Sequence, residues 1–330
     1  MSLRRGSKQK QHKANNKKGY DVASALSEPT SLVVTPDDFL RAGLVYAGFD
    51  EHRQANNNDR QKLNWFKAFY GVEPEIIAAI FEEIRIIKKK AIAKVFLMTV
   101  NWLFLYDTYP VLSGRWKYSE DFIAENVIEY GLVMAKISGK KIVFELEHDV
   151  ELGRTVDCCN FTIQEMRLDP NSKWYDHKSN SCGLKYEFCL AVHEPRIVWI
   201  SGPHPPSRHD ITVFRGGTTD EDCNNWDQSA LYFQLEPGEK CIGDSGYAGE
   251  PDKIVVEKDR HKPDMKKFLS RAKNRQETFH TRLKSFNILG NRFRHGANTD
   301  DKLRLHRMAV YAVAGIIQFD YENKRPPFGV

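Results

Sequence analysis

Three acidic residues occupy positions from which carboxylates can do chemistry. Asp157 lies in the otherwise apolar run TVDCC, and Asp244 follows CIG and precedes the turn residues Ser245 and Gly246. An ionised carboxylate inside an apolar strand is costly unless it is paired or bound to a metal. Carboxylates at strand ends converge at one edge of a sheet, where α/β proteins form their sites. Glu277 is the third candidate, because it is surrounded by basic residues that can hold a phosphate backbone.

Each acid also has a plainer explanation. Asp157 or Asp244 alone is more often a turn-capping or salt-bridged residue. Glu277 can form a solvated ion pair with Lys273, which is worth roughly a few tenths of a kcal/mol at this helical spacing. The apolar residues of this helix fall on one stripe, opposite Glu277. They are Phe268, Ala272, Phe279, Leu283 and Phe286. The helix taken alone favours the ion pair.

The sequence lacks the common motifs of nucleotide-binding and hydrolytic sites. It contains no GxxxxGK[ST], no GxGxxG after a predicted strand, no GxSxG and no HExxH. Its six cysteines form no CxxC pair, which argues against a disulfide framework and a structural zinc site. We find neither a signal peptide nor an apolar run of about 20 residues, the length that spans a bilayer. Membrane and secreted classes are excluded on this basis, and the acids remain as candidates.

The net charge of +5 conceals two basic blocks. Residues 1–20 carry seven Lys and Arg and no acid, and residues 258–294 carry twelve Lys and Arg against three acids. Two such blocks on an otherwise acidic chain favour nucleic acid as a partner, although each block alone is equally well a solvated tail or helix. The candidate phosphate contacts in the second block are Arg271, Lys273, Arg275, Arg282 and Lys284.

The first part of the chain is predicted to be an arm followed by helices. Residues 1–35 are basic, polar and aperiodic, which predicts a disordered arm. Residues 36–145 predict a small helical domain, with one helix after Pro74, a buried one over 91–106 and one capped by Ser119. A DNA-binding role for this domain stays open. A packing bundle is favoured, because the link over 107–118 is long for a helix-turn-helix.

Residues 146–330 predict an α/β or α+β domain, since short strands come first and helices follow. The β-branched segment 155–163 predicts a strand. Alternation over 184–192, a turn at 193–196 and an apolar return over 197–200 predict a hairpin. Further short strands are predicted at 240–243 and 254–256, and helices at 210–214, 265–286 and 303–319.

Several short motifs in this region follow one another in a specific order. They are TVD at 155–157, YDHK at 175–178, GLKY at 183–186, GP at 202–203, RHD at 208–210, VF at 213–214, GDSGY at 243–247, RAKNRQETF at 271–279 and LK at 283–284. In this order and spacing they resemble the DDE-type transposases of the PIF/Harbinger group. The resemblance covers residues 150–295 well and extends more loosely from residue 63.

The resemblance implies an RNase H-like fold, an α/β mixed sheet flanked by helices. It also implies a catalytic, metal-binding triad of Asp157, Asp244 and Glu277 that cleaves and joins DNA ends. Two Mg²⁺ or Mn²⁺ ions about 4 Å apart can activate an oxygen nucleophile and neutralise the leaving oxygen. In this arrangement Asp157 bridges both ions, Asp244 binds one and Glu277 the other. Asp210, which matches the family's His-Asp string, is expected to be structural or to support the ligands.

The same resemblance sets expectations about partners and location. Double-stranded DNA is the expected substrate, a homo-oligomer the expected active form and the nucleus the expected location. A separate DNA-binding protein is a further candidate partner. Two residues depart from the family pattern: Cys158 stands where glycine is usual after the first aspartate, and His280 stands where a small residue is common after the glutamate. Neither departure removes a ligand.

Three functions therefore stand as candidates. A metal-dependent DNA transposase or nuclease is favoured over a domesticated, catalytically inactive DNA-binding protein on the same fold. An unrelated hydrolase that uses paired carboxylates is the third. Metal-dependent nicking of DNA would separate the first two, and Mg²⁺-independent turnover of a small substrate would favour the third.

Overall fold

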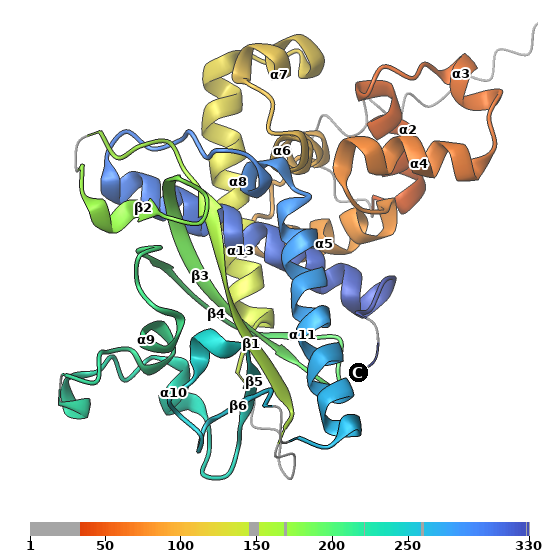
Figure 1. The fold of residues 1–330 in the computed structure, drawn as a ribbon. Coiled ribbons are helices and arrows are strands. Elements are labelled where there is room, and N and C mark those ends of the chain that lie inside the picture. Colours follow the sequence, from red (N-terminus) through yellow and green to blue (C-terminus); the bar gives the residue numbers. More distant parts are fainter. Residues whose placement is uncertain are drawn as a thin grey trace, which may run out of the picture.

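The computed structural model describes residues 34–144, 152–167, 170–220, 222–258, 261–327 and 329 (Figure 1). The predicted basic arm at residues 1–35 therefore lies almost wholly outside the described residues. The predicted boundary between the helical and α/β domains also lies outside them, because residues 145–151 are not described. The division into domains stays a prediction.

The segment before that boundary is helical, as its sequence pattern predicts. Thr35 and Asp38 form a reciprocal capping box at the first described helix, and the Ser119 hydroxyl accepts the Phe122 N–H at 3.3 Å where the last one begins. The helix expected within 91–106 is buried around almost its whole circumference. The helices are α2 (Pro36–Tyr46), α3 (Glu51–Ala55), α4 (Asp59–Tyr70), α5 (Pro74–Ile87), α6 (Ala93–Leu105), α7 (Tyr109–Trp116) and α8 (Glu120–Lys141).

The described strands form one six-stranded mixed sheet that curls across the molecule (Figure 1). They are β1 (Arg154–Thr162), β2 (Tyr175–Asp176), β3 (Ser181–Ala191), β4 (Ile197–His204), β5 (Cys241–Gly243) and β6 (Ile254–Val256). β3 pairs antiparallel with β1, β2 and β4, whereas β1, β5 and β6 run parallel to one another. β1 therefore lies between an antiparallel and a parallel neighbour.

Helices cover both faces of this sheet. One face, which includes Tyr186 and Phe188 of β3, packs against the three C-terminal helices. The opposite face, which includes Cys189 of β3 and Val198 of β4, packs against two short helices. In chain order these helices are α9 (Asp210–Arg215), α10 (Leu231–Gln234), α11 (Pro263–Lys284), α12 (Asn287–Gly290) and α13 (Thr299–Asn323).

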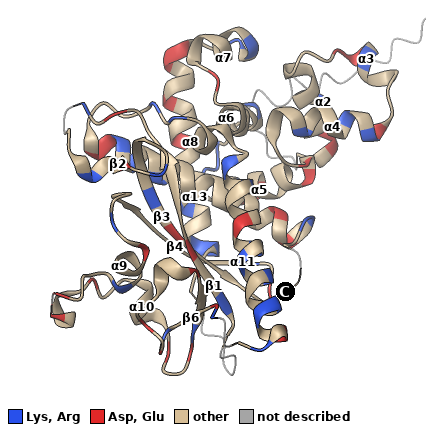
Figure 2. Ribbon diagram, in the orientation of Figure 1, with Lys and Arg blue, Asp and Glu red and all other residues tan. Residues whose placement is uncertain are grey.

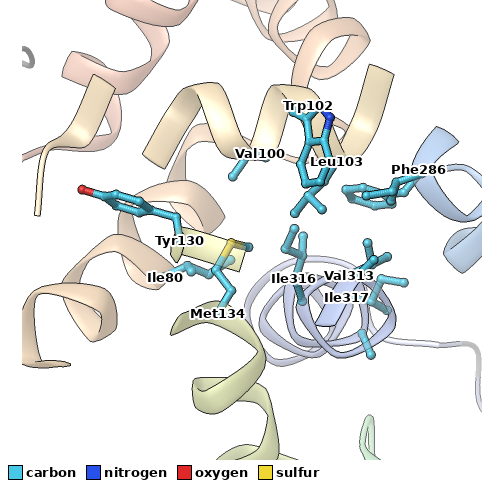
Figure 3. Close-up of a cluster of buried hydrophobic side chains, with 14 of the residues drawn as sticks. Ile80, Val100, Trp102, Leu103, Tyr130, Met134, Phe286, Val313, Ile316 and Ile317 are labelled. Carbon is cyan, nitrogen blue, oxygen red and sulfur yellow. The ribbon is translucent and has the colours of Figure 1, made fainter. Parts of the chain in front are cut away.

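Helix α13 connects the helical segment to the sheet. It packs along α8 and α5 on one side and along β4 on the other. Figure 3 shows Val313, Ile316 and Ile317 of α13 gathered with Trp102 of α6 and Met134 of α8, all of them buried. Because burial of one large apolar side chain contributes about 1.5–3 kcal/mol, this shared core holds the helical segment firmly against the sheet.

The structure confirms the predicted order of strands and helices after residue 152. The strand at 155–163 is β1, the hairpin is β3 and β4, and the long basic helix is α11. The two-residue strand β2 is an addition that its short, polar sequence did not indicate. Within the described ranges, no helix is both long enough and apolar enough to cross a membrane.

Candidate active site

Asp157 is the most central of the candidate acids, because β1 lies between β3 and β5. Its side chain is 20% exposed, and its Oδ2 lies 3.7 Å from Nδ1 of His280 on α11. Its Oδ1 accepts the Cys158 N–H at 2.8 Å. Burial, reinforced by the negative charges of Asp244 and, more weakly, Glu277 and Asp210, raises the pKa of Asp157 to about 7. The four carboxyl groups therefore interact electrostatically.

Asp244 follows β5, and the sheet register brings it towards Asp157. β1 and β5 run parallel with Thr155 opposite Ile242, so Asp157 and Asp244 each lie two residues farther along neighbouring strands. Oδ1 of Asp244 accepts the Gly246 N–H at 2.7 Å and caps the 3₁₀ turn Ser245–Tyr247. The turn-capping explanation thus describes one oxygen of Asp244, and it does not remove the residue from the acidic group.

Gly246 leaves room for two of the acids. A Cβ at this position would lie 3.0 Å from Oδ2 of Asp210 and 3.0 Å from Oδ1 of Asp244. Real Cβ contacts are rarely so short, so a side chain here would push the carboxylates apart. The glycine in GDSGY thus allows Asp210 and Asp244 to approach each other.

Glu277 is placed by the residues beside it on α11. The Gln276 amide oxygen accepts a hydrogen bond from the Thr155 hydroxyl at 2.7 Å, and its NH₂ donates to the Phe188 carbonyl at 3.2 Å. The buried Arg275 guanidinium donates to the carbonyls of Val192 and Glu194. These contacts fix the rotation of α11 on the sheet, so that Glu277 is exposed on the opposite side.

Asp210 has a cationic partner of its own. Oδ1 accepts a hydrogen bond from the ammonium of Lys185 at 2.6 Å, and the same ammonium donates to the Arg208 carbonyl. Lys185 is 6% exposed, so its charge is neutralised by Asp210 rather than by water. This ion pair fixes the Asp210 carboxylate at the cavity, and its supporting role stays a prediction.

All four acids line one cavity of about 650 Å³. Asp157, Asp210, Asp244 and Glu277 thus come together from β1, α9, the end of β5 and α11. Basic residues line the same cavity: Lys178, Lys185, Arg208 and Lys284. Of these, Lys178, Arg208 and Lys284 form no ion pair with any part of the chain that the structure describes. The cavity thus combines interacting carboxylates with cations that are not neutralised by them.

The carboxylates fit a hard divalent cation by their chemistry. All are oxygen donors. The pKa of Asp157 is raised first by burial and then by the negative charges beside it, and a bound cation would offset both effects. Among the described residues, no three His, Cys, Asp or Glu side chains are already arranged to hold one ion. Side-chain rotation would therefore have to accompany metal binding.

The two residues that depart from the family pattern are placed differently: Cys158 follows Asp157 in β1, and His280 lies near the Asp157 carboxylate. Cys158 points to the opposite face of the sheet, where its Sγ accepts a hydrogen bond from the Tyr247 hydroxyl at 3.2 Å. Burial raises the pKa of the Cys158 thiol well above its usual range, so it remains a neutral thiol. Burial and the charge of Lys284 lower the pKa of His280 to about 3, so His280 is a neutral neighbour of Asp157.

The five basic residues predicted to contact phosphate do not share one environment. Lys284 is exposed and lines the cavity, whereas Lys273 pairs with Glu257 at 3.0 Å. Arg271 donates to the Gly329 carbonyl, and Arg282 forms an ion pair with the buried Asp320. Arg275 is 3% exposed, and its two terminal guanidinium nitrogens donate to backbone carbonyls, so it is not available to a phosphate in this arrangement. Figure 2 shows Lys and Arg in the first part of α11 and again at its C-terminal end.

The sequence analysis missed the basic and aromatic residues that β2 and the loop before α9 bring to the cavity. Tyr175, His177, Lys178 and Arg208 belong to the YDHK and RHD motifs, yet those motifs gave no sign that they would face the acids. A fully buried acid, Glu187, was also missed. It lies opposite Cys158 in the sheet register, and burial, above all, raises its pKa to about 8.

Comparison with known families bears on the segment that carries the site. Residues 156–316 match the model of a family described as DDE superfamily endonuclease, which supports a transposase-derived endonuclease domain over that span. The match includes all four acids. The comparisons with curated proteins and with solved structures gave no match.

Proposed function

We propose that this protein is a divalent-metal-dependent DNA endonuclease of the transposase type, with Asp157, Asp244 and Glu277 as its metal ligands. The observation that carries the proposal is the single cavity in which these acids meet cations that they do not neutralise. A phosphodiester backbone needs both kinds of group, because cations hold its phosphates while carboxylates hold the metal. The family match over residues 156–316 points to the same chemistry.

The metal would supply an activated oxygen nucleophile and neutralise charge on the leaving oxygen. We assign the protein's own side chains the tasks of binding and orientation. Lys178, Arg208 and Lys284 would hold phosphates on either side of the acids. Lys185 holds Asp210 in place through their ion pair, and the neutral His280 limits the rotation of Asp157 without adding positive charge.

The strand order supports an RNase H-like core as part of this proposal. We propose this core because Asp157 lies on a central strand, Asp244 follows a neighbouring parallel strand and Glu277 lies on a helix that packs on the sheet. Here β1, β5 and α11 have these relations, and α11 packs directly on β1 and β5. We propose the PIF/Harbinger group as the subgroup, on the motifs that carry the resemblance.

Nicking of a supercoiled plasmid tests the proposal. Wild-type protein and Asp244→Asn would be incubated with Mg²⁺, with Mn²⁺ and with a chelator. We expect nicking by the wild type with metal only, and none by Asp244→Asn, which keeps its size but loses the charge that a hard cation needs. Ser245→Ala, which changes the neighbouring turn residue and no acid, is the matched control and should nick like the wild type.

The outcomes separate the candidate functions. Equal nicking by wild type and Asp244→Asn would contradict the ligand assignment. Salt-sensitive DNA binding without nicking by the wild type, on its own terminal repeats as well as on plasmid, would favour the catalytically inactive DNA-binding protein. Mg²⁺-independent turnover of a small substrate would favour the unrelated hydrolase.

The partners and location remain part of the proposal. We propose double-stranded DNA as the substrate, a homo-oligomer as the active form and the nucleus as the location, with residues 1–20 as the basic import or DNA-contact segment. A separate DNA-binding protein could supply sequence recognition. Light scattering with and without DNA tests the oligomer, and a fluorescent fusion with and without residues 1–20 tests the location.

A further inference from the structure

The cavity has an aromatic wall opposite α11, formed by β2 and the loop that follows it. Tyr175 is 37% exposed, and its ring meets that of His177 in a T-shaped contact with centroids 5.1 Å apart and planes at 80°. Both residues line the cavity of the four acids. A T-shaped contact uses the edge of one ring and one face of the other, so ring faces remain free for another planar group.

The backbone that carries this wall is held in place. Asp176 is 6% exposed, and its carboxylate accepts the Lys178 N–H at 3.0 Å and the Ser179 hydroxyl at 2.9 Å. Tyr175 pairs with Cys182 of β3. The exposed aromatic rings therefore project from an ordered turn, and their exposure is a property of the fold.

Cations accompany the aromatic rings on this wall. Lys178 follows His177 directly, and Arg208 lies in the loop before α9, which is joined to the same segment because the Ser207 hydroxyl donates to the Lys173 carbonyl at 3.0 Å. Lys178 and Arg208 line the cavity and form no ion pair with the described residues. Aromatic faces interleaved with unpaired cations are the arrangement by which proteins bind single-stranded nucleic acid.

The position of the wall fits a strand that continues from the acids. Thr162 of β1 pairs with Gly183, which adjoins the β2 partner Cys182. Thr162 lies five residues beyond Asp157, a distance of roughly 17 Å along a strand. A DNA strand with its reacting phosphodiester at the acids would therefore reach Tyr175 and His177 within a few nucleotides.

We propose that Tyr175 and His177 stack on unpaired bases of the DNA strand that enters the acidic cavity, while Lys178 and Arg208 hold its phosphates. The site would thus favour a DNA end with a single-stranded extension over an intact duplex. Within a duplex both faces of each base are covered by its neighbours, and at a blunt end only the outer face of the terminal pair is free. A single-stranded extension therefore offers the tyrosine far more base surface. This inference rests on the proposed function, since it takes DNA as the substrate of the acids.

Binding in the presence of a chelator tests the inference apart from cleavage. Fluorescence anisotropy would compare a blunt duplex with the same duplex carrying a single-stranded extension, for wild type, Tyr175→Ala and Tyr175→Phe. We expect the wild type to prefer the extended duplex. Tyr175→Ala should lose about tenfold in affinity for the extension and little for the blunt duplex, whereas Tyr175→Phe should keep its affinity, because stacking needs the ring and not the hydroxyl.

Two further readouts separate stacking from charge. A 2-aminopurine base in the extension should lose fluorescence when the wild type or Tyr175→Phe binds, and should not when Tyr175→Ala binds. For the extended duplex, Lys178→Ala should reduce the slope of the logarithm of the binding constant against the logarithm of salt concentration by about 0.7. Tyr175→Ala should leave that slope unchanged. If Tyr175→Ala lowers the unfolding midpoint, the wild-type 2-aminopurine signal and its retention in Tyr175→Phe decide the question.

The result that would overturn the inference is equal affinity of wild type and Tyr175→Ala for the extended duplex, or an unchanged 2-aminopurine signal on wild-type binding. A wild type that fails to nick DNA but shows the tyrosine-dependent preference would contradict the proposed cleavage and keep this inference. A wild type that nicks DNA but shows no preference for the extended duplex would support the proposed cleavage and contradict this inference.

Discussion

The two faces of α11 carry basic residues with different roles, one in the packing of the fold and the other in the acidic cavity. On the inner face, Arg275 is buried and donates to the Val192 and Glu194 carbonyls, so its charge serves the fold. On the outer face, Glu277 and Lys284 line the acidic cavity, and Lys284 has no ion-pair partner in the described ranges. A count of basic residues treats Arg275 and Lys284 alike. The packing of the helix decides which of them can meet a phosphate.

The largest expected effect is on the cavity side. Asp157→Asn removes the carboxylate that faces all the other acids. Loss of an outer-shell partner of a metal typically costs 10–100-fold in activity, so loss of the central ligand should lower metal-dependent cleavage by more than about 100-fold. Single-turnover cleavage of a labelled DNA end would measure this. Retained cleavage would contradict the assignment of Asp157 as a metal ligand. Salt-sensitive DNA binding by the variant is the control that it is folded.

The next effect concerns Glu187, an acidic residue buried on the side of β3 that faces α9. Neither of its carboxyl oxygens accepts a hydrogen bond of ordinary geometry from described residues, although Trp199 and Tyr247 lie close enough to lower its pKa somewhat. Because its pKa is about 8 in the folded state and near 4.5 when unfolded, the folded state holds the proton more tightly. Stability should therefore fall as pH rises from about 4.5 to about 8.

Glu187→Gln tests this directly. The amide cannot ionise, so the variant should exceed the wild type in free energy of unfolding by about 4 kcal/mol at pH 8, and the difference should shrink towards pH 4.5. Urea unfolding at several pH values would measure it. Asp157 titrates in the same direction in both proteins, so only their difference is informative. A constant difference across this pH range would contradict the raised pKa.

Arg275→Ala should affect stability and spare DNA electrostatics. The substitution leaves the buried Val192 carbonyl and the more exposed Glu194 carbonyl without their charged donor, which should cost about 2–3 kcal/mol of unfolding free energy. DNA binding, measured at a temperature where the variant stays folded, should keep the salt dependence of the wild type. A flatter salt dependence would mean that Arg275 contacts phosphate after all, and the distinction between the two faces of α11 would fail.

Lys284→Ala is the matched change on the outer face and should have the opposite signature. Its effect on unfolding free energy should stay within about 0.5 kcal/mol, as for exposed surface positions. The logarithm of its DNA-binding constant should fall less steeply with the logarithm of salt concentration, by about 0.9 in slope, because one phosphate contact is lost. An unchanged slope would mean that Lys284 is a solvated surface residue that does not contact phosphate.

The sequence predicted much of the fold because local patterns determine it. The β-branched run around Asp157, the alternation in β3 and the apolar stripe of α11 each depend on neighbours within one element, and the observed elements match them. The alternation also gave one wrong expectation, because it predicts that the polar residues Lys185 and Glu187 of β3 face solvent. Both are buried, since α9 and the turn at Tyr247 cover that face of the sheet as well. A two-sided burial of this kind depends on distant segments.

The candidate site was predictable in its acids and only partly in its cations. Asp157 and Asp244 were visible because a charge inside or directly after an apolar strand is unusual. The contacts of Arg275 and Arg282 were not predictable, since their acceptors, the Val192 carbonyl and Asp320, lie far away in the sequence. Tyr175 reaches the cavity through a two-residue strand whose pairing depends on β3, and no local pattern indicates it.

The central claim is that Asp157, Asp244 and Glu277 together hold divalent metal, and Mn²⁺ binding measured by electron paramagnetic resonance tests it most directly. The signal of free Mn²⁺ would be followed during titration of wild type, Asp157→Asn and, as a matched control, Lys284→Ala, without DNA and at pH 8, above the pKa of Asp157. The account predicts that wild type and Lys284→Ala bind Mn²⁺ and that Asp157→Asn loses this binding. Equal Mn²⁺ binding by Asp157→Asn and wild type would contradict it.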